Sequence, residues 1–155
     1  MKNEMIRLLQ PYFEKRDDIV MAFIFGSWAC DKGGMESDVD VAVYFKPKTG
    51  RLEWEDADAR YDGETVLWRE IEGLLGREVD MLVLNRAASG IAESAISGMP
   101  VIIKDRDLYM DFMMKVTSEA ADYREFVMSY WKLKEEMRAR KNESKSLYHS
   151  EKRGA

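Results

Sequence analysis

A glycine, a serine and three aspartates in the first half of the chain have the types and spacing of a phosphate and metal site. Gly26 and Ser27 end an apolar segment, and Asp38 and Asp40 follow after a short spacer. A Gly-Ser turn after a strand presents backbone N–H groups and a hydroxyl to an anion. On a strand, Asp38 and Asp40 point to the same side and repel each other unless a cation lies between them. Magnesium prefers such oxygen ligands and shares them with phosphates. The pattern therefore predicts a site for a nucleoside triphosphate with bound magnesium.

Asp80 lies in a later segment that is otherwise apolar, and a carboxylate there is explained if it completes the same site. Two simpler interpretations stay open at this point. Asp38 caps a turn while Asp40 faces solvent on an edge strand, or Asp80 pairs with Arg77 or Arg86. The combination of the turn with three carboxylates favours the site.

The hydrophobic pattern indicates the elements that must position these residues. A helix over Met5–Phe13 is expected, with a kink or break at Pro11. Up to the middle of the chain we expect a strand over 19–25, a turn with a short helix over 27–34, a strand over 38–45 and a long loop over 46–62. A helix over 63–76 follows, with an apolar stripe of Val66, Leu67, Ile71, Leu74 and Leu75. The rest should form a strand over 78–85, a helix over 88–97, a short strand over 101–103 after a turn at 98–100, and either one helix from Leu108 or two that are interrupted near Thr117-Ser118. In the strand over 38–45, we expect Val39, Val41, Val43 and Phe45 to share one face.

This order predicts an α/β (α+β) fold: a small mixed β-sheet flanked by helices, with a C-terminal helical extension. We take residues 1–104 as the core and 105–155 as the extension with a basic tail, together forming a single domain. The loop segment 53–58 is acidic and is expected to be a solvated, mobile lid. His149 is expected to have no chemical role.

Composition narrows the function classes. The chain has 155 residues and a net charge of −5, and only residues 132–155 are basic overall. An acidic body repels phosphates, so a long nucleic-acid substrate is disfavoured. The apolar segments are too short to span a membrane, the first residues do not resemble a signal peptide, and Cys30 is the only cysteine. These observations predict a cytoplasmic protein that does not insert into membranes.

The turn, the Asp-x-Asp pair and the later aspartate together resemble the minimal nucleotidyltransferases (MNT proteins) of the DNA polymerase beta-type superfamily. The resemblance runs over roughly residues 19–85, with a compatible continuation to about residue 135. It implies a nucleotidyltransferase fold in which Gly26 and Ser27 hold the triphosphate. It also implies that Asp38, Asp40 and Asp80 bind two magnesium ions as the catalytic carboxylates, with Asp80 helping to deprotonate the acceptor.

The chain departs from the family pattern in the turn. Family members often have arginine where this chain has Cys30. Lys32 stands two residues later, and we consider it as a substitute that contacts the nucleotide. Cys30 itself is expected to be a small packing residue. If Lys32 does not supply the charge, triphosphate binding should be weak.

The resemblance implies transfer of a nucleoside monophosphate, AMP from ATP, to a hydroxyl. Small MNT proteins are often antitoxins beside a HEPN ribonuclease toxin, so a HEPN-type protein is the expected partner and acceptor. One alternative is an antitoxin of the same fold that acts by binding without catalysis. Another is an enzyme that modifies a small hydroxylated molecule. The sequence leaves a homo-oligomer open.

Overall fold

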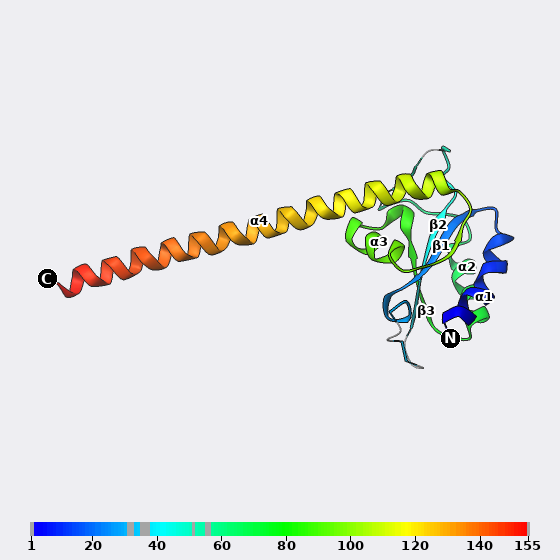
Figure 1. Cartoon of the computed structure of the whole chain (residues 1–155), viewed down its shortest axis with the longest axis horizontal. Helices are drawn as coiled ribbons and strands as arrows, with labels where there is room; N and C mark the ends of the chain where they lie inside the picture. Colours follow the sequence, from blue (N-terminus) through cyan, green and yellow to red (C-terminus); the bar gives the residue numbers. More distant parts are fainter. Residues whose placement is uncertain (1, 31–32, 35–37, 51, 55–56, 155) are drawn as a thin grey trace. The chain divides into compact units, whose positions relative to one another are not determined.

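The computed structural model describes residues 2–30, 33–34, 38–50, 52–54 and 57–154. It divides into two compact units, Met1–Ser118 and Glu119–Ala155. Along the chain the elements are α1 (Lys2–Glu14), β1 (Ile19–Phe25), the 3-10 turn η1 (Gly26–Trp28), β2 (Val39–Phe45), α2 (Glu64–Leu75), β3 (Val79–Val83), the 3-10 turn η2 (Leu84–Arg86), α3 (Ser89–Ile96), β4 (Met99–Ile103) and α4 (Arg106–Arg153) (Figure 1).

The four strands form one mixed sheet in the order β3-β2-β1-β4. Strand β1 is antiparallel to β2 and β4, and β2 is parallel to β3. Helices cover both faces of this sheet, so the structure confirms the predicted fold class. None of the helices in the described part of the chain is both long and apolar enough to cross a lipid bilayer.

Strand β2 shows why the sheet is buried on both sides. Val39, Val41, Val43 and Phe45 pack in one core with residues of α1 and α2, as their alternation predicts. Ala42 and Tyr44 pack on the opposite face with α3 and the first turns of α4. Because β2 lies between β1 and β3, Asp40 is not on an edge strand, and that interpretation of the sequence is wrong.

Helix α1 continues through Pro11, so the expected break is wrong. Proline inside a helix costs about 3 kcal/mol. The helix buries Met5, Leu9 and Phe13, one turn apart, and each large buried side chain contributes about 1.5–3 kcal/mol. Packing against the sheet therefore outweighs the cost of Pro11.

Two further expectations about the elements are wrong for local reasons. Val66 and Leu74 are exposed, because α2 buries only the narrower stripe of Leu67 and Ile71. Strand β4 begins at Met99 rather than after a turn. Helix α4 is continuous through Thr117, which bears out the single-helix alternative, and the Thr117 hydroxyl donates to the Met113 carbonyl at 2.7 Å.

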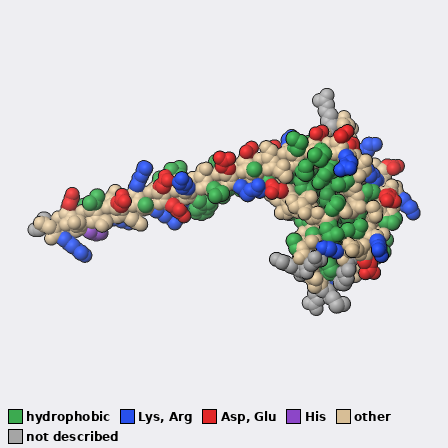
Figure 2. Space-filling model, in the orientation of Figure 1, with side chains coloured by type: hydrophobic (Ala, Val, Ile, Leu, Met, Phe, Trp, Pro, Cys, Tyr) green, Lys and Arg blue, Asp and Glu red, His purple; other side chains and the backbone are tan. Residues whose placement is uncertain are grey.

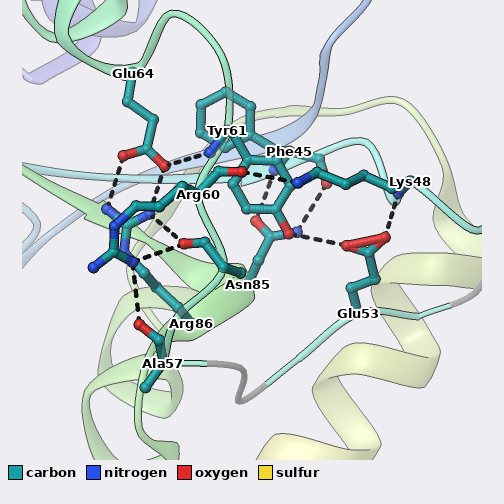
Figure 3. Close-up of polar contacts among 10 residues, drawn as sticks. Phe45, Lys48, Glu53, Ala57, Arg60, Tyr61, Glu64, Asn85 and Arg86 are labelled. Atoms are coloured by element: carbon teal, nitrogen blue, oxygen red, sulfur yellow. Dashed lines mark hydrogen bonds and ion pairs between the residues drawn. The ribbon is translucent and has the colours of Figure 1, made fainter.

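The strand expected over 78–85 ends early, at Val83, because the chain turns into η2 and buries Asn85 completely. The Asn85 side chain accepts a hydrogen bond from the Phe45 N–H at 2.9 Å and donates to the Phe45 carbonyl at 3.0 Å. It thus extends the pairing of β2 and β3 by two residues beyond the last backbone pair, Val43 with Val83 (Figure 3).

Replacing Asn85 by alanine should lower the free energy of unfolding by about 2–4 kcal/mol, because two buried backbone groups of Phe45 lose their partners. Urea denaturation measures the change. Asn142→Ala, at an exposed position of α4, is the matched control and should shift stability by less than about 0.5 kcal/mol. Equal effects of the two changes would contradict a structural role for Asn85.

The described part of the loop over 46–62 is anchored, so the mobile lid is wrong for Glu53 and Trp54. The Tyr44 hydroxyl donates to the Glu53 carbonyl at 2.8 Å and accepts from the Glu53 N–H at 3.0 Å. The Trp54 indole donates to the Ala87 carbonyl at 3.0 Å. The Tyr61 hydroxyl donates to the Glu53 carboxylate at 3.0 Å (Figure 3). Residues 55–56, within the same expected lid, lie outside the described residues.

Candidate active site

The structure brings the Gly-Ser turn and the Asp-x-Asp segment together at the end of the β1–β2 pair. Phe25, the last residue of β1, pairs with Asp40 on β2. Gly26 follows at once with a φ of +72°, which turns the chain out of the strand. A Cβ atom on Gly26 would lie 2.2 Å from Asp40 Oδ2. The Asp40 carboxylate therefore occupies the space that any other residue at position 26 would fill.

Asp80 lies beside Asp40, on the neighbouring strand β3. In the parallel pairing of β2 and β3, Asp40 is in register with Asp80. Neighbouring strands lie about 4.8 Å apart, and residues in register point to the same face. Asp80 and Asp38 are exposed, and Asp40 is partly buried. Parallel pairing of β2 and β3 thus aligns residues that are far apart in the sequence.

The negative charges of Asp80 and Asp38 act on Asp40. Burial raises the pKa of the Asp40 carboxyl above its ordinary value, and the negative charges of Asp80 and Asp38 raise it further. Repulsion of this kind is relieved by a cation bound between the carboxylates.

A metal ion needs several ligand atoms close together around one point. Within the described ranges, no group of three His, Cys, Asp or Glu side chains is close enough to hold a metal ion as the side chains stand. The donor chemistry nevertheless fits a hard divalent cation, because Asp38, Asp40 and Asp80 offer only carboxylate oxygens. The repulsion of Asp40 by Asp80 and Asp38 points to the same group.

A cavity of about 570 Å³ opens beside the turn. The turn contributes one wall, and α3 with the start of β4 contributes the other. The residues around it are Gly26, Ser27, Ala29, Cys30, Glu93, Ser94, Ser97, Gly98 and Met99. Gly98 allows this wall to approach β1, because a Cβ there would lie 2.4 Å from the Ile24 carbonyl oxygen. The cavity is large enough for a nucleotide-sized ligand.

Cys30 is exposed and lines this cavity, so its interpretation as a packing residue is wrong. The residues of the far wall, Glu93, Ser94 and Ser97, were missed by sequence reasoning. The glycine that precedes β4 is the one signal that could have found them, since it marks a close approach of two backbones. Lys32 lies outside the described residues.

A smaller cavity of about 330 Å³ lies beside Asp80 and is lined by Glu64, Thr65, Trp68, Asp80, Met81 and Arg86. Arg86 does not serve as the partner of Asp80 that the sequence allowed. Its guanidinium instead makes a two-pronged ion pair with the Glu64 carboxylate, at 2.5 and 3.0 Å (Figure 3). The Arg77 guanidinium lies over the Trp28 ring, 4.8 Å from its centroid.

Comparison with known proteins agrees with this geometry. Residues 8–107 match the family model described as Polymerase beta, Nucleotidyltransferase. A search of curated proteins found no match. A crystal structure of a toxin–antitoxin with AMP-PNP is similar, with 19% identity and a TM-score of 0.57 over 79% of this chain and 89% of that chain.

Two further solved structures share the fold. A tri-AMPylated Shewanella oneidensis HEPN toxin in complex with MNT antitoxin matches at 18% identity and a TM-score of 0.52, over 79% of this chain and 86% of that chain. A toxin–antitoxin MntA-HepT structure matches at 18% identity and a TM-score of 0.51, with the same coverage. The family model covers most of the chain and the fold is that of the MNT structures, so the chain belongs to the Polymerase beta nucleotidyltransferase family.

Proposed function

We propose that the chain is a magnesium-dependent adenylyltransferase that transfers AMP from ATP to a hydroxyl of a HEPN-type partner protein and thereby acts as an antitoxin. The observation that carries this proposal is the contact of the Asp40 carboxylate with Gly26, in register with Asp80. This contact supports a role of the turn in binding phosphate beside the carboxylates. The AMP-PNP complex and the AMPylated HEPN toxin among the similar structures support the choice of nucleotide and partner.

In this proposal the cavity beside the turn receives ATP. The Ser27 hydroxyl and the N–H groups of the turn donate hydrogen bonds to the phosphate oxygens. Asp38, Asp40 and Asp80 hold two magnesium ions, which when bound would polarise the α-phosphate and neutralise the leaving pyrophosphate. Catalysis then rests on positioning and charge neutralisation, with no covalent enzyme intermediate.

The acceptor hydroxyl approaches from the side of Asp80, where the smaller cavity lies. Its oxygen forms a bond to the α-phosphorus, the bond to pyrophosphate breaks, and the proton passes to the Asp80 carboxylate. The exposure of Asp80 suits a large acceptor such as a partner's side chain.

The test is transfer of label from α-labelled ATP, with magnesium, in lysate of the source cell. Wild type is compared with Asp80→Asn and with Asp111→Asn, an exposed aspartate of α4 as the control. A labelled protein band with wild type and the control, absent with Asp80→Asn, would support the proposal and identify the acceptor. Label on a small molecule would show that the acceptor is not a protein. If the folded protein transfers no label although its partner is present, the proposal of catalysis is refuted.

A second candidate, a binding antitoxin without catalysis, is favoured by one observation: Cys30 lines the nucleotide cavity at the position where family members often have arginine. The described part of the turn thus offers the triphosphate hydrogen bonds from Ser27 and the backbone, but no cationic side chain. The two candidates differ in whether the chain turns over ATP.

Substituting Ser27 by alanine should weaken ATP binding by about 1–2 kcal/mol, a roughly 5- to 30-fold rise in Kd, because one hydrogen bond to a charged group is lost. Titration calorimetry with a non-hydrolysable ATP analogue measures the change. Ser150→Ala, near the end of α4, is the control. An unchanged Kd for the Ser27 variant would remove this hydroxyl from the phosphate site.

Introducing the missing charge with Cys30→Arg should tighten ATP binding by about tenfold or more, since a guanidinium makes charge-assisted hydrogen bonds to phosphate. The same titration measures it, with Cys30→Ser as a size-matched neutral control. If arginine gives no gain over serine, position 30 does not face the phosphates.

A further inference from the structure

The part of α4 that follows Ser118 carries an apolar seam that is exposed to solvent. Large side chains recur there at alternating steps of three and four residues, and all are 50–69% exposed: Tyr123, Phe126, Tyr130, Leu133 and Met137. Figure 2 shows apolar side chains between charged ones along this helix. Alternation of three and four is the spacing of the a and d positions of a coiled coil. We call these five residues the α4 seam.

A helix with such a seam is unstable by itself. Isolated helices are marginal in water, and most helical stability in proteins comes from packing of an apolar face. In residues 119–155 the described side chains are almost all exposed. Contiguous exposed apolar surface of this kind marks an interaction site. A partner helix that covers the α4 seam would supply the missing packing.

The charges beside the seam show which partner fits. With Tyr123, Tyr130 and Met137 at a positions, Glu136 occupies a g position and Lys141 the next e position. In a parallel pair, g of one chain faces the following e of the other. Glu136 of each copy therefore lies beside Lys141 of the other copy, which gives two such pairs in the dimer. The other g–e pairs of the seam, Asp122 with Val127 and Ser129 with Lys134, bring no like charges together. In the antiparallel pair that aligns Tyr123 with Leu133 of the other copy, g faces g, so Glu136 meets Asp122 and acid faces acid.

We propose that the α4 seam is a self-association surface: two copies of this chain join through a parallel, in-register coiled coil over residues 123–144, and the α4 seam is its apolar part. The seam ends where Arg140 and Ser144 take the next d and a positions. The two apolar heptads span only about 21 Å, so the dimer is short and reversible rather than permanent. This proposal does not depend on nucleotidyl transfer.

The first test measures the mass of the full chain by light scattering or sedimentation between about 1 µM and 1 mM. Wild type should pass from monomer to dimer across this range. Leu133→Asp should raise the dimer Kd by about 100-fold or more, because two leucines are lost per dimer and each is worth roughly tenfold or more. Met128→Asp, on the outer face of the helix and 72% exposed, is the control and should dimerise like wild type.

A charge exchange tests the pairing without touching the apolar residues. Glu136→Lys and Lys141→Glu should each weaken the dimer about three- to tenfold at low salt, because exposed ion pairs are individually weak. The double variant should restore the homodimer, and an equal mixture of the two single variants should form a heterodimer. Failure of both restorations would overturn the pairing.

Disulfide formation tests the direction of the helices, in a Cys30→Ser background. Cysteine at position 140 or 144, the d and a positions that directly follow the seam, should cross-link to the same position of the second copy, since in-register a and d positions lie within the Cα distance of about 4.4–6.8 Å that a disulfide needs. Asn142→Cys, on the outer face, should not. The proposal is overturned if the chain stays monomeric at all concentrations or associates only with a HEPN-type partner. A dimer that forms without these cross-links would refute the parallel arrangement.

Discussion

Replacing Asp40 by asparagine should lower nucleotidyl transfer by about 1000-fold or more while leaving the fold intact. Asp40 contacts the phosphate turn at Gly26 and is in register with Asp80, so it links the two halves of the proposed site. Loss of its charge removes several kcal/mol of transition-state stabilisation that carboxylate-bound metal would supply. Label transfer from α-labelled ATP measures the loss, and Asp111→Asn again serves as the control. Turnover within about tenfold of wild type would end the proposal that Asp40 is a metal ligand.

The same substitution should raise stability at neutral pH in the absence of divalent metal. The pKa of Asp40 is raised above its ordinary 3.8 by burial and by Asp80 and Asp38, so the folded state binds this proton more readily than the unfolded state. Ionised Asp40 therefore costs stability above its folded pKa. The cost fades as the pH falls from that pKa to 3.8.

Thermal unfolding in a chelator at several pH values measures this effect. The Asn variant should have the higher Tm at neutral pH, and the two proteins should converge in acid. Added magnesium should raise the Tm of wild type more than that of the variant, because a ligand that binds only the folded state stabilises it. A lower Tm of the variant at neutral pH would mean that Asp40 stabilises the fold.

The sheet could be predicted from the sequence because its strands carry unambiguous patterns. The alternation in 38–45 assigns Val39 and Phe45 to one face and Tyr44 to the other, and the structure agrees. Sequence position alone could not show that Asp40 and Asp80 are neighbours. That proximity depends on the parallel pairing of β2 and β3.

Several misses have the same cause: contacts between distant residues outweigh local preference. Asn85 is the last residue of the strand expected over 78–85 and Arg86 follows it, yet Asn85 pairs with Phe45 and Arg86 with Glu64. Likewise the acidic composition around Trp54 indicates a solvated loop, whereas its indole is bonded to Ala87. Local composition does not reveal these partners, because they are set by the packing of the loop on the sheet.

Gly26→Ala should also strongly lower transfer, for a steric reason. An added Cβ would lie 2.2 Å from Asp40 Oδ2, so either the carboxylate or the turn must move out of its position. The φ of +72° adds a backbone cost of about 1–2 kcal/mol for any residue with a Cβ. We expect a loss of about 100-fold or more in transfer, since displacement of a positioned group by about 1 Å has this effect.

Gly50→Ala separates the two causes, because Gly50 has nearly the same φ, +74°, and an added Cβ there meets nothing within 4 Å. Both variants should lose a similar 1–2 kcal/mol of stability from backbone strain alone, measured by urea denaturation. Only Gly26→Ala should also lose transfer and the magnesium-dependent rise in Tm. If Gly50→Ala loses as much transfer as Gly26→Ala, the loss is caused by general destabilisation. If Gly26→Ala keeps its transfer activity, the contact of Gly26 with Asp40 does not position the carboxylate for the reaction.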